Sequence, residues 1–560
     1  MRGRNASPFV NFTSHPRHLW ERTTRGEGVR LSSCIPFLMG GVILASLLLR
    51  PLPAFAQATA GTPLGHVTDP TGLAVPDVTV TARQTQTGYV RTVLTNSTGD
   101  YLMLSMPMGA YAITAAKAGF SQFEQTGIEL TVGAEVRVDI PLAVGSLSQK
   151  VEVKAEATMV NTVSGQVSGL VDSARIVELP LSGRNVLALT ALQPGVSDVN
   201  APQTFARLED AGTMNISGGR INEYAEYVDG AISMSPLFGY GLNLPPPDSV
   251  AEFRMLLNSY AAEYGRTSGG SVNAVTKSGT NQIHGTAYEF LRNDAFNART
   301  FFAPSVTPSR QNQFGASAGY YVPLPRGKRL YLFGNYEGLR VRTAGVATSA
   351  YLPTAQQESG VFPETIIDPT TGQPFPNNTI PPDRINPVSQ AILAKIPTAP
   401  CTNCASTFFG ASPDNLDEEF IRGDYDINSK NRLSVTVFNW KNTNTSAFSR
   451  STNVPGWNPG FQNLHILNPT IALTSTFSPT LLNEFHAGTV PANEPFGNSN
   501  HFDLHSLGSA FPSVNTPPWI IVGNEFSLEP DVDGYQEDRD AWFTDSLAWI
   551  KGHHTFKTGF

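Results

Sequence analysis

Residues 268–293 read SGGSVNAVTKSGTNQIHGTAYEFLRN, and the character of the chain changes within this stretch. The first half is rich in Gly, Ser, Thr and Asn, residue types that favour turns. In the second half Thr286, Tyr288 and Phe290 alternate with Gly, Ala and Glu. A period of two is typical of an extended strand whose two faces meet different surroundings. The stretch therefore marks the start of a region built from strands.

Alternating segments of the same kind recur further along the chain, at 314–320 and at 433–440. Short polar turns join some of them, at Asn428–Asn431 and at Ser478–Thr480. Long alternating strands with short turns at one end are typical of outer-membrane β-barrels. We therefore expect a partial antiparallel transmembrane β-barrel over residues 281–560.

Two long stretches rich in Pro and Asn, 344–418 and 441–469, separate these strands. A compact soluble domain rarely holds loops of this length, whereas a barrel carries them on its outer side. With the loops set aside, residues 283–560 leave room for about ten spanning strands of roughly 9–11 residues each. An open sheet of about ten strands would expose two unpaired edges to lipid, so we expect the barrel to be incomplete and the final Phe560 not to be a barrel terminus.

Residues 268–293 resemble the junction between plug and barrel in Oar-like TonB-dependent receptors. Three upstream segments resemble plug signatures of the same family: Asn215–Arg220, Tyr227–Gly230 and Ala262–Gly265. The resemblance implies an α+β plug domain at 158–280, which we call the plug region. Within it, Ser182 is expected to cap a helix through Leu192 that ends at Pro194-Gly195.

Two further expectations concern the plug region. Asp248 and Ser249 are predicted to cap a short helix before Phe253–Leu257. The pair Asp229-Gly230 is predicted to form a hairpin turn rather than a ligand contact, because such pairs favour tight turns.

Residues 57–148 are predicted to form a small Ig-like β-sandwich. Val78, Val80 and Ala82 alternate with polar residues, and turn signals recur about every ten residues. The segments at 65–69, 75–80, 95–101, 107–111 and 119–120 resemble the carboxypeptidase regulatory-like domain, which has a carbohydrate-binding-like fold. The name implies no peptidase, since His18 and Glu21, the His-x-x-Glu pair of the chain, lie near the N-terminus.

Residues 149–157 form a short alternating segment that resembles the TonB box of such receptors. The candidate contacts with TonB are Val151, Glu152, Val153, Lys154 and Ala155. An extended segment of this kind can add as a strand to a partner's sheet. The alternative interpretation is a last strand of the sandwich followed by a linker, and both remain open.

Residues 1–56 are expected to be an export signal. An apolar run from Ile35 to Leu49 follows an Arg-rich segment, and Ala54-Phe55-Ala56 predicts cleavage between Ala56 and Gln57. Removing seven Arg and two Glu takes the formal net charge from −8 to about −13. This negative balance argues against a nucleic-acid partner.

Cys401 and Cys404 are the cysteines that remain after cleavage. In an exported protein a small disulfide is the favoured interpretation, over a redox site or half of a zinc site. The acidic residues Asp531, Asp533, Glu537 and Asp538 are interpreted as a solvated loop, since their spacing does not match an EF-hand.

Two short motifs are interpreted as coincidences within strands. Gly315-Ala316-Ser317-Ala318-Gly319 matches a nucleophile pattern that requires a strand, a sharp turn and a helix. Arg422-Gly423-Asp424 matches an adhesion tripeptide. No arrangement of residues predicts catalysis, a cofactor or a metal, so we expect a protein that is not an enzyme.

The resemblance implies energy-coupled uptake of a siderophore, an oligosaccharide or a peptide. Its implied partners are the TonB–ExbB–ExbD complex, outer-membrane lipid and an unidentified ligand. The N-terminal sandwich would lie in the periplasm. The alternative is a structural or adhesive surface protein that transports nothing.

Overall fold

The computed structural model describes residues 60–560 except for a set of gaps. The gaps are 146–149, 155–164, 180, 201–211, 236–238, 240, 259, 262, 266, 300, 302–305, 307, 449–452, 455–456, 458, 500–503, 512–517, 524, 530–532 and 553. The predicted cleavage site at Ala56 and Gln57, together with Ala155, lies outside the described residues.

The N-terminal part is a sandwich of two sheets. One sheet has the order β3-β2-β5-β6-β9, and the other has β4, β1 and β7 with β8 beside β1. The bounds are β1 Thr62–Thr68, β2 Thr79–Gln84, β3 Val90–Leu94, β4 Asp100–Leu102, β5 Gly109–Ala116, β6 Gln122–Leu130, β7 Glu135–Arg137, β8 Ile140–Pro141 and β9 Lys150–Lys154. The predicted Ig-like fold class is confirmed for this part of the chain.

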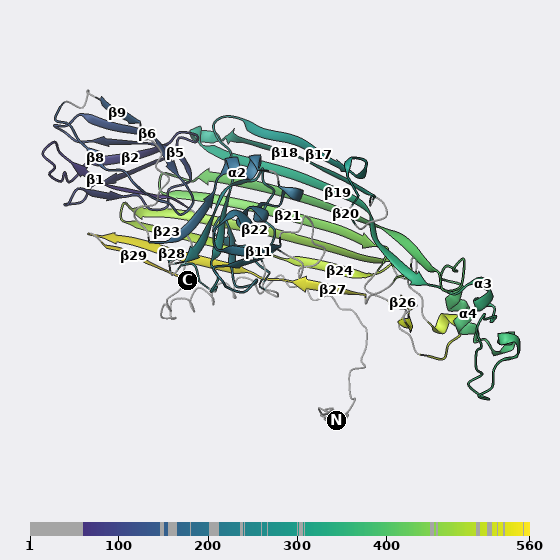
Figure 1. Ribbon diagram of the computed structural model, residues 1–560. Coiled ribbons are helices and arrows are strands. Elements are labelled where there is room, and N and C mark those ends of the chain that lie inside the picture. Colours follow the sequence, from purple (N-terminus) through teal and green to yellow (C-terminus); the bar gives the residue numbers. More distant parts are fainter. Residues whose placement is uncertain are drawn as a thin grey trace, which may run out of the picture. The chain divides into compact units, whose positions relative to one another are not determined.

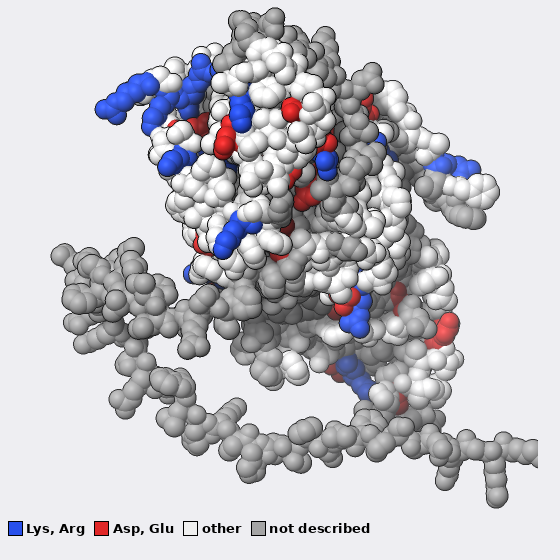
Figure 2. All heavy atoms as spheres, turned by 90° about the vertical axis from the view of Figure 1, so that its left-hand side faces the viewer, with Lys and Arg blue, Asp and Glu red and all other residues white. Residues whose placement is uncertain are grey.

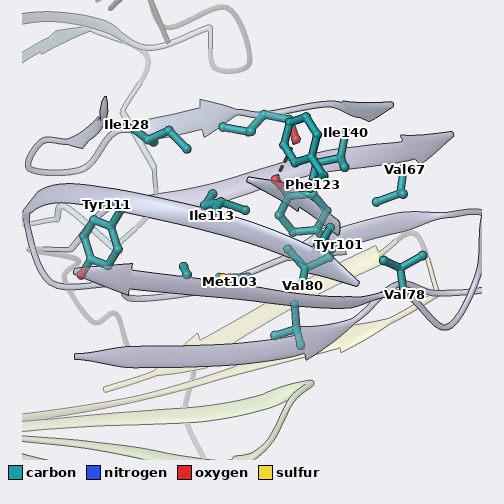
Figure 3. Packing of buried hydrophobic residues seen from close by; sticks show 14 of the residues in the cluster. Val67, Val78, Val80, Tyr101, Met103, Tyr111, Ile113, Phe123, Ile128 and Ile140 are labelled. Carbon is teal, nitrogen blue, oxygen red and sulfur yellow. Dashed lines mark hydrogen bonds between the residues drawn. The ribbon is translucent and has the colours of Figure 1, made fainter. Parts of the chain in front are cut away.

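The sandwich is held together by the alternate residues that the sequence marks as apolar. Val78, Val80 and Ile113 are fully buried between the sheets, as Figure 3 shows. Tyr101 is also buried there, and its hydroxyl donates to the backbone oxygen of Val138 at 2.7 Å. Burial of each such aliphatic side chain contributes about 1.5–3 kcal/mol to stability.

The plug region contains a five-stranded mixed sheet in the order β10-β15-β16-β13-β14 and a two-stranded sheet of β11 and β12. The bounds are β10 Val167–Val171, α2 Ser173–Glu178, η1 Ser182–Arg184, η2 Val186–Leu192, β11 Val196–Asn200, β12 Thr213–Ile216, β13 Ala225–Val228, β14 Ala231–Ile232, β15 Val250–Asn258 and β16 Ser271–Thr276. The plug region has a separate hydrophobic core, in which Phe253, Met255 and Val272 are fully buried.

Both predictions of a helix in the plug region are wrong: the first segment forms two short 3-10 helices and the second forms a strand. Ser182 does not cap one continuous helix, because Gly183 and Arg184 have positive φ angles of 72° and 55° and break the turn. The following 3-10 helix η2 is capped instead by Asn185, whose side chain accepts from the backbone N–H of Leu187 at 2.9 Å. The element ends before Pro194-Gly195, as predicted.

The second predicted helix is a strand. Phe253–Leu257 lies inside β15, which is buried on both faces between β10 and β16. A short apolar run buried on both sides shows no period that separates strand from helix. Asp248 and Ser249 lie in the turn that precedes this strand.

Residues from 284 onward form an eleven-stranded antiparallel sheet. Nine strands follow one another in space in the order β17-β18-β19-β20-β21-β22-β23-β28-β29, and β24 with β27 extends from β22 (Figure 1). The strand bounds are β17 His284–Asn293, β18 Ser309–Pro323, β19 Arg329–Tyr351, β20 Ala405–Asp426, β21 Asn431–Ser446, β22 Gly460–Ser478, β23 Leu481–Gly488, β24 Ala492–Asn498, β27 Gly534–Asp538, β28 Trp542–Lys551 and β29 His554–Gly559. Both predicted short turns are confirmed, between β20 and β21 and between β22 and β23.

The loops between these strands are shorter than the sequence indicated. β19 continues to Tyr351 and β20 begins at Ala405, so that 352–404 joins them instead of 344–418. Similarly, β21 extends to Ser446 and β22 starts at Gly460. Pairing along a neighbouring strand satisfies the backbone of these Pro- and Asn-rich segments, which local composition does not reveal.

The loop segments have a small core of their own. Trp457, Val454 and Leu528 are buried against Ile396 and Leu352. The remaining short elements are η4 Asp294–Phe296, η5 Pro325–Gly327, α3 Ala355–Glu358, η6 Pro376–Asn378, η7 Pro382–Arg384, α4 Pro387–Leu393, η8 His505–Leu507, β25 Ile520–Val522 and β26 Phe526–Leu528. No helix among the described residues combines the length and apolar character needed to cross a membrane.

Candidate functional site: ion pairs between the plug region and the eleven-stranded sheet

The hairpin turn between β13 and β14 carries the first functional side chain. Asp229 and Gly230 both have positive φ, 50° and 80°, as a two-residue type I′ turn requires. The predicted turn is confirmed. The Asp229 carboxylate accepts from the backbone N–H of Thr276 at 3.0 Å and from its hydroxyl at 2.6 Å. These bonds fix the carboxylate at the edge of the plug sheet.

Arg422, on β20, is the partner of this turn. Its Nη1 donates to Asp229 Oδ1 at 2.9 Å and to the backbone oxygen of Thr276 at 3.0 Å. Its Nε donates to Asp424 on its own strand at 2.8 Å. Asp424 also accepts from the hydroxyl of Ser278, at the end of the plug region. A single guanidinium thus ties the plug hairpin to the sheet.

A second guanidinium belongs to the plug region and contacts a carboxylate of the eleven-stranded sheet. Arg184 pairs with Asp248 of its own region and, through Nε, with Glu337 Oε2 of β19 at 3.2 Å. Its left-handed backbone, rare for a residue with a side chain, places it between these carboxylates. The guanidinium lies 4.1 Å from the centre of the Tyr288 ring and 5.1 Å from that of Phe290.

The sheet side of this second contact is built from three neighbouring strands. The Tyr288 hydroxyl donates to Glu337, and Gln313 Nε2 donates to the other oxygen of Glu337 at 2.5 Å. Thr286 donates to Asp248 Oδ1 at 2.7 Å. Thr286, Tyr288 and Phe290 therefore lie on one face of β17, as their alternation predicts.

The two guanidinium contacts differ from the apolar contacts nearby. Leu242 is the plug residue in an apolar cluster formed otherwise by Val490, between β23 and β24, and side chains of the eleven-stranded sheet, such as Phe333 and Trp440. Beside it, Asn243 donates to Glu418 of β20 at 3.3 Å. The apolar clusters of the plug region itself contain no residue of the eleven-stranded sheet. The described plug interface with the sheet is therefore largely polar.

Burial shifts the pKa of ionisable groups within the plug region. It raises the pKa of Glu226, a fully buried residue of β13, well above its usual value. Burial also lowers the pKa of Arg184, but the neighbouring Glu337, Tyr288 and Asp248 raise it by more, so that its net pKa lies above the usual value. Arg184 therefore remains a cation at every pH at which the protein folds.

The candidate TonB contacts and the two cysteines lie outside this interface. Val151, Glu152, Val153 and Lys154 lie in β9, which pairs with β6 of the sandwich. Cys401 and Cys404 are joined by a disulfide in the loop before β20. Gly315 and Ser317 lie inside β18, away from any strand-to-helix turn.

The acidic residues near the C-terminal end do not form one cluster. Asp531 lies outside the described residues. Asp533 accepts from the backbone N–H of Asn498 at 2.7 Å, and Glu537 accepts from Arg539 Nε at 2.6 Å. Among the residues that the structure describes, no three His, Cys, Asp or Glu side chains gather in a way that could hold a metal ion.

Sequence reasoning missed Arg184, Glu337, Asp248 and the role of Arg422. Arg422 and Asp424 were interpreted as a coincidental tripeptide, whereas both take part in the interface. The available signal was the charge of β20, which carries seven Asp, Glu or Arg residues among its 22, whereas 15% of the whole chain is charged. On the described face that Figure 2 shows, most residues are uncharged, and Lys and Arg lie among Asp and Glu.

Two family models match the chain. The outer membrane beta barrel domain matches residues 275–560, and the carboxypeptidase regulatory-like domain matches residues 64–143. A curated relative is the TonB-dependent transporter Oar of Myxococcus xanthus, 28% identical over 257 residues, which cover 44% of this chain and 23% of the relative.

The solved structures to which the chain is similar include the following two. The siderophore receptor PirA from Acinetobacter baumannii has a TM-score of 0.41 at 12% identity, covering 72% of this chain and 49% of that one. The outer membrane transporter YddB from Escherichia coli has a TM-score of 0.38 at 9% identity, covering 70% and 47%. The chain thus spans about a quarter of the curated relative and about half of each of these structures.

Proposed function

This chain belongs to the family of the outer membrane beta barrel domain and is located in the cell outer membrane, and on that premise we propose that it acts in TonB-dependent, energy-coupled uptake. The proposed organisation is a signal at 1–56, a periplasmic sandwich at 57–148, a TonB-contact segment at 149–157, a plug at 158–280 and barrel strands at 281–560. The similarity to the Oar transporter, over part of its length, supports this assignment.

The polar interface of the plug region is the observation that carries the proposal. A gating domain must leave its place without exposing a large apolar surface to water, because that exposure costs about 25 cal/mol per Å². Here the plug region keeps its own apolar cores, and it makes charged contacts with the sheet through Arg184 and Arg422 and through Glu263, which pairs with Lys557 of β29. Ion pairs and hydrogen bonds act over short distances, so that a small displacement breaks them.

The proposed action needs no covalent chemistry. TonB binds the segment 149–157 and pulls, the contacts of Arg184 and Arg422 break, and the plug region shifts or unfolds to open a path for the ligand. The proposed ligand class is a siderophore, an oligosaccharide or a peptide.

The experiment measures binding of the purified periplasmic domain of TonB from the source organism to the full chain in detergent. The chain without residues 149–157 is expected to lose this binding. Its thermal melt and tryptic pattern, compared with those of the wild type, report whether the deleted chain is folded. Equal binding of the two chains, or no binding by the wild type, would favour a structural or adhesive protein instead.

A further inference from the structure

One turn of the sandwich, directly after β6, is held by two charged side chains of the plug region. The backbone N–H of Val132 donates to the Glu252 carboxylate, and the backbone oxygen of Val132 accepts from Arg254 Nε at 2.6 Å. Nη2 of the same guanidinium donates to the Thr131 hydroxyl at 3.1 Å. Glu252 and Arg254 are each 9% exposed. We call this set of contacts the Val132 clasp.

The clasp uses the face of β15 that points away from the plug core. Glu252 and Arg254 alternate along the strand with Phe253 and Met255, which are fully buried in that core. The strand itself lies between β10 and β16 in the plug sheet. A displacement of the plug sheet that leaves the sandwich behind must therefore break the clasp.

A second set of contacts joins the sandwich to the eleven-stranded sheet and to the segment that precedes it. In the turn between β2 and β3, the backbone oxygen of Gln86 accepts from the N–H of Asn281 at 3.0 Å. The backbone oxygen of Thr87 accepts from the hydroxyl of Tyr331, on β19, at 2.6 Å. Residues of both sandwich turns line a cavity of about 850 Å³ together with the plug region and strands β20 to β23. The docked sandwich thus forms one wall of this cavity.

The sandwich can leave this position without opening its own core. Among the described residues, its buried apolar cluster and that of the plug region share no member. At these contacts the sandwich offers backbone N–H and C=O groups and one hydroxyl, all of which water can satisfy after release. An apolar contact face would instead cost about 25 cal/mol per Å² on exposure. The docked position is therefore suited to reversible release.

We propose that the sandwich is a detachable lock on the plug region. While the sandwich is docked, the Val132 clasp holds β15 in place, and release of the sandwich precedes any shift of the plug region. This inference rests on the plug movement of the proposed function. The competing arrangement is a docked sandwich that is not coupled to the plug region, so that its release leaves the plug region as stable as before.

Hydrogen exchange of the full chain in detergent separates these arrangements. The amides of Val132 and Asn281 report docking, because each donates across a contact between the sandwich and the rest of the chain. The amides of β15 and β16 report the plug region, and those of β5 report whether the sandwich is folded. The measurement needs neither TonB nor a ligand, so that its result is distinct from that of the TonB-binding experiment.

The variant Tyr331→Phe weakens docking without changing any residue of the sandwich or the plug region. It removes the hydroxyl that donates to Thr87. Loss of one ordinary hydrogen bond corresponds to about a fivefold change in an equilibrium. We expect the amides of Val132, Asn281, β15 and β16 to exchange about fivefold faster, because release of the sandwich must come first, and the β5 amides to exchange as in the wild type.

The variant Val132→Pro breaks the clasp itself. The N–H of Ala134 donates to the backbone oxygen of Thr131 at 3.1 Å, and Gly133 has a φ of 59°, as in a type II turn. Proline is favoured at the position that Val132 occupies in such a turn, so that the substitution removes the N–H that Glu252 accepts and keeps the turn. We again expect exchange in β15 and β16 to be about fivefold faster.

Each variant has a matched control. Tyr336→Phe removes a hydroxyl from the same strand, one that donates at the same 2.6 Å but to Asp417 of β20. Ser97→Pro places a proline at the second position of an exposed sandwich turn, which the N–H of Gly99 closes onto the backbone oxygen of Asn96 at 3.0 Å. Both controls should leave exchange in β15 and β16 at the wild-type rate.

Two results would overturn the lock. Faster exchange at Asn281 with unchanged exchange in β15 and β16 would show that the sandwich leaves without freeing the plug region. Unchanged exchange at Asn281 in both variants would show that these contacts do not hold the sandwich. If Val132→Pro also speeds exchange in β5, the sandwich itself is disturbed, and Tyr331→Phe alone decides.

Discussion

Arg184 donates through Nε to Oε2 of Glu337 at 3.2 Å, so that a cation of the plug region is paired with a carboxylate that lies on β19 of the surrounding sheet. The side chains are 13% and 2% exposed. Removing one partner of a buried pair leaves the other charge without compensation, whereas removing both costs much less.

Arg184→Met should therefore loosen the plug region strongly. The expected loss is about 3–5 kcal/mol, because Glu337 and Asp248 both lose their cation. Hydrogen exchange of the β15 and β16 amides measures it. The control is Arg175→Met, whose surface pair with Asp172 is 58% and 34% exposed and should contribute less than about 1 kcal/mol. The double variant Arg184→Met with Glu337→Gln should recover part of the loss, and no recovery would show that the ion pair is not the cause.

Asp229→Asn should weaken the second contact without disturbing the turn, since Asn tolerates a positive φ. The expected coupling energy between Asp229→Asn and Arg422→Met lies between about 0.5 and 3 kcal/mol in a double-mutant cycle. Protease sensitivity of the plug region is a suitable measurement. Asp77→Asn is the matched control, because Asp77 has the same φ of 50° but lies in the sandwich. Strictly additive effects would rule out a direct contribution of the pair.

Burial raises the pKa of Glu252, on β15, to about 7. A carboxyl whose pKa is raised on folding stabilises the fold fully below its unfolded pKa, near 4.5, and this contribution is lost as the pH rises through 7. We expect the plug region to lose about 3 kcal/mol of stability between pH 4.5 and pH 7.5.

The variant Glu252→Gln tests this dependence. It should flatten the pH profile of hydrogen exchange in β15, while Glu178→Gln, an exposed change of equal charge on α2, should leave the slope intact. An unchanged slope in Glu252→Gln would assign the pH dependence to other groups.

Cys401 and Cys404 should be joined in protein taken from the outer membrane. Their Cα atoms lie 5.5 Å apart, inside the range of native disulfides. Mass spectrometry of the unreduced peptide should find it about 2 Da lighter than the dithiol, by the two hydrogens lost. The Cys401→Ser, Cys404→Ser variant should destabilise the loop locally by about 2 kcal/mol. Two free thiols in the native envelope would contradict the prediction.

Patterns of neighbouring residues predicted the local structure well. The period of two around Tyr288 correctly predicts which side chains of β17 share a face, because a strand places alternate side chains on opposite faces. The turn at Asp229-Gly230 is equally local, since both residue types accept positive φ. The strand at Phe253–Leu257 was missed because both of its faces are buried, which removes the alternation.

The interface between the plug region and the sheet could not be predicted in this way. Arg184 and Glu337 are 153 residues apart in the sequence, and Arg422 and Asp229 are 193 apart. Nothing in the neighbourhood of either arginine indicates which distant carboxylate faces it. The carboxylate that each guanidinium meets is set by the packing of the plug region against β19 and β20, which no local pattern contains.

The strands β19 and β20 have 23 and 22 residues, about twice what a bilayer crossing needs. At about 3.3 Å per residue and a tilt near 40°, this hairpin rises roughly 55 Å, while the lipid-facing band is about 25 Å tall. With the short turns at the inner membrane surface, as in such barrels, we expect the tip with the bonded cysteines to lie roughly 30 Å outside the lipid. A molecule diffusing toward the cell therefore meets this hairpin well before it reaches the membrane surface. Antibodies or labels directed at residues 352–404 should accordingly bind to intact cells.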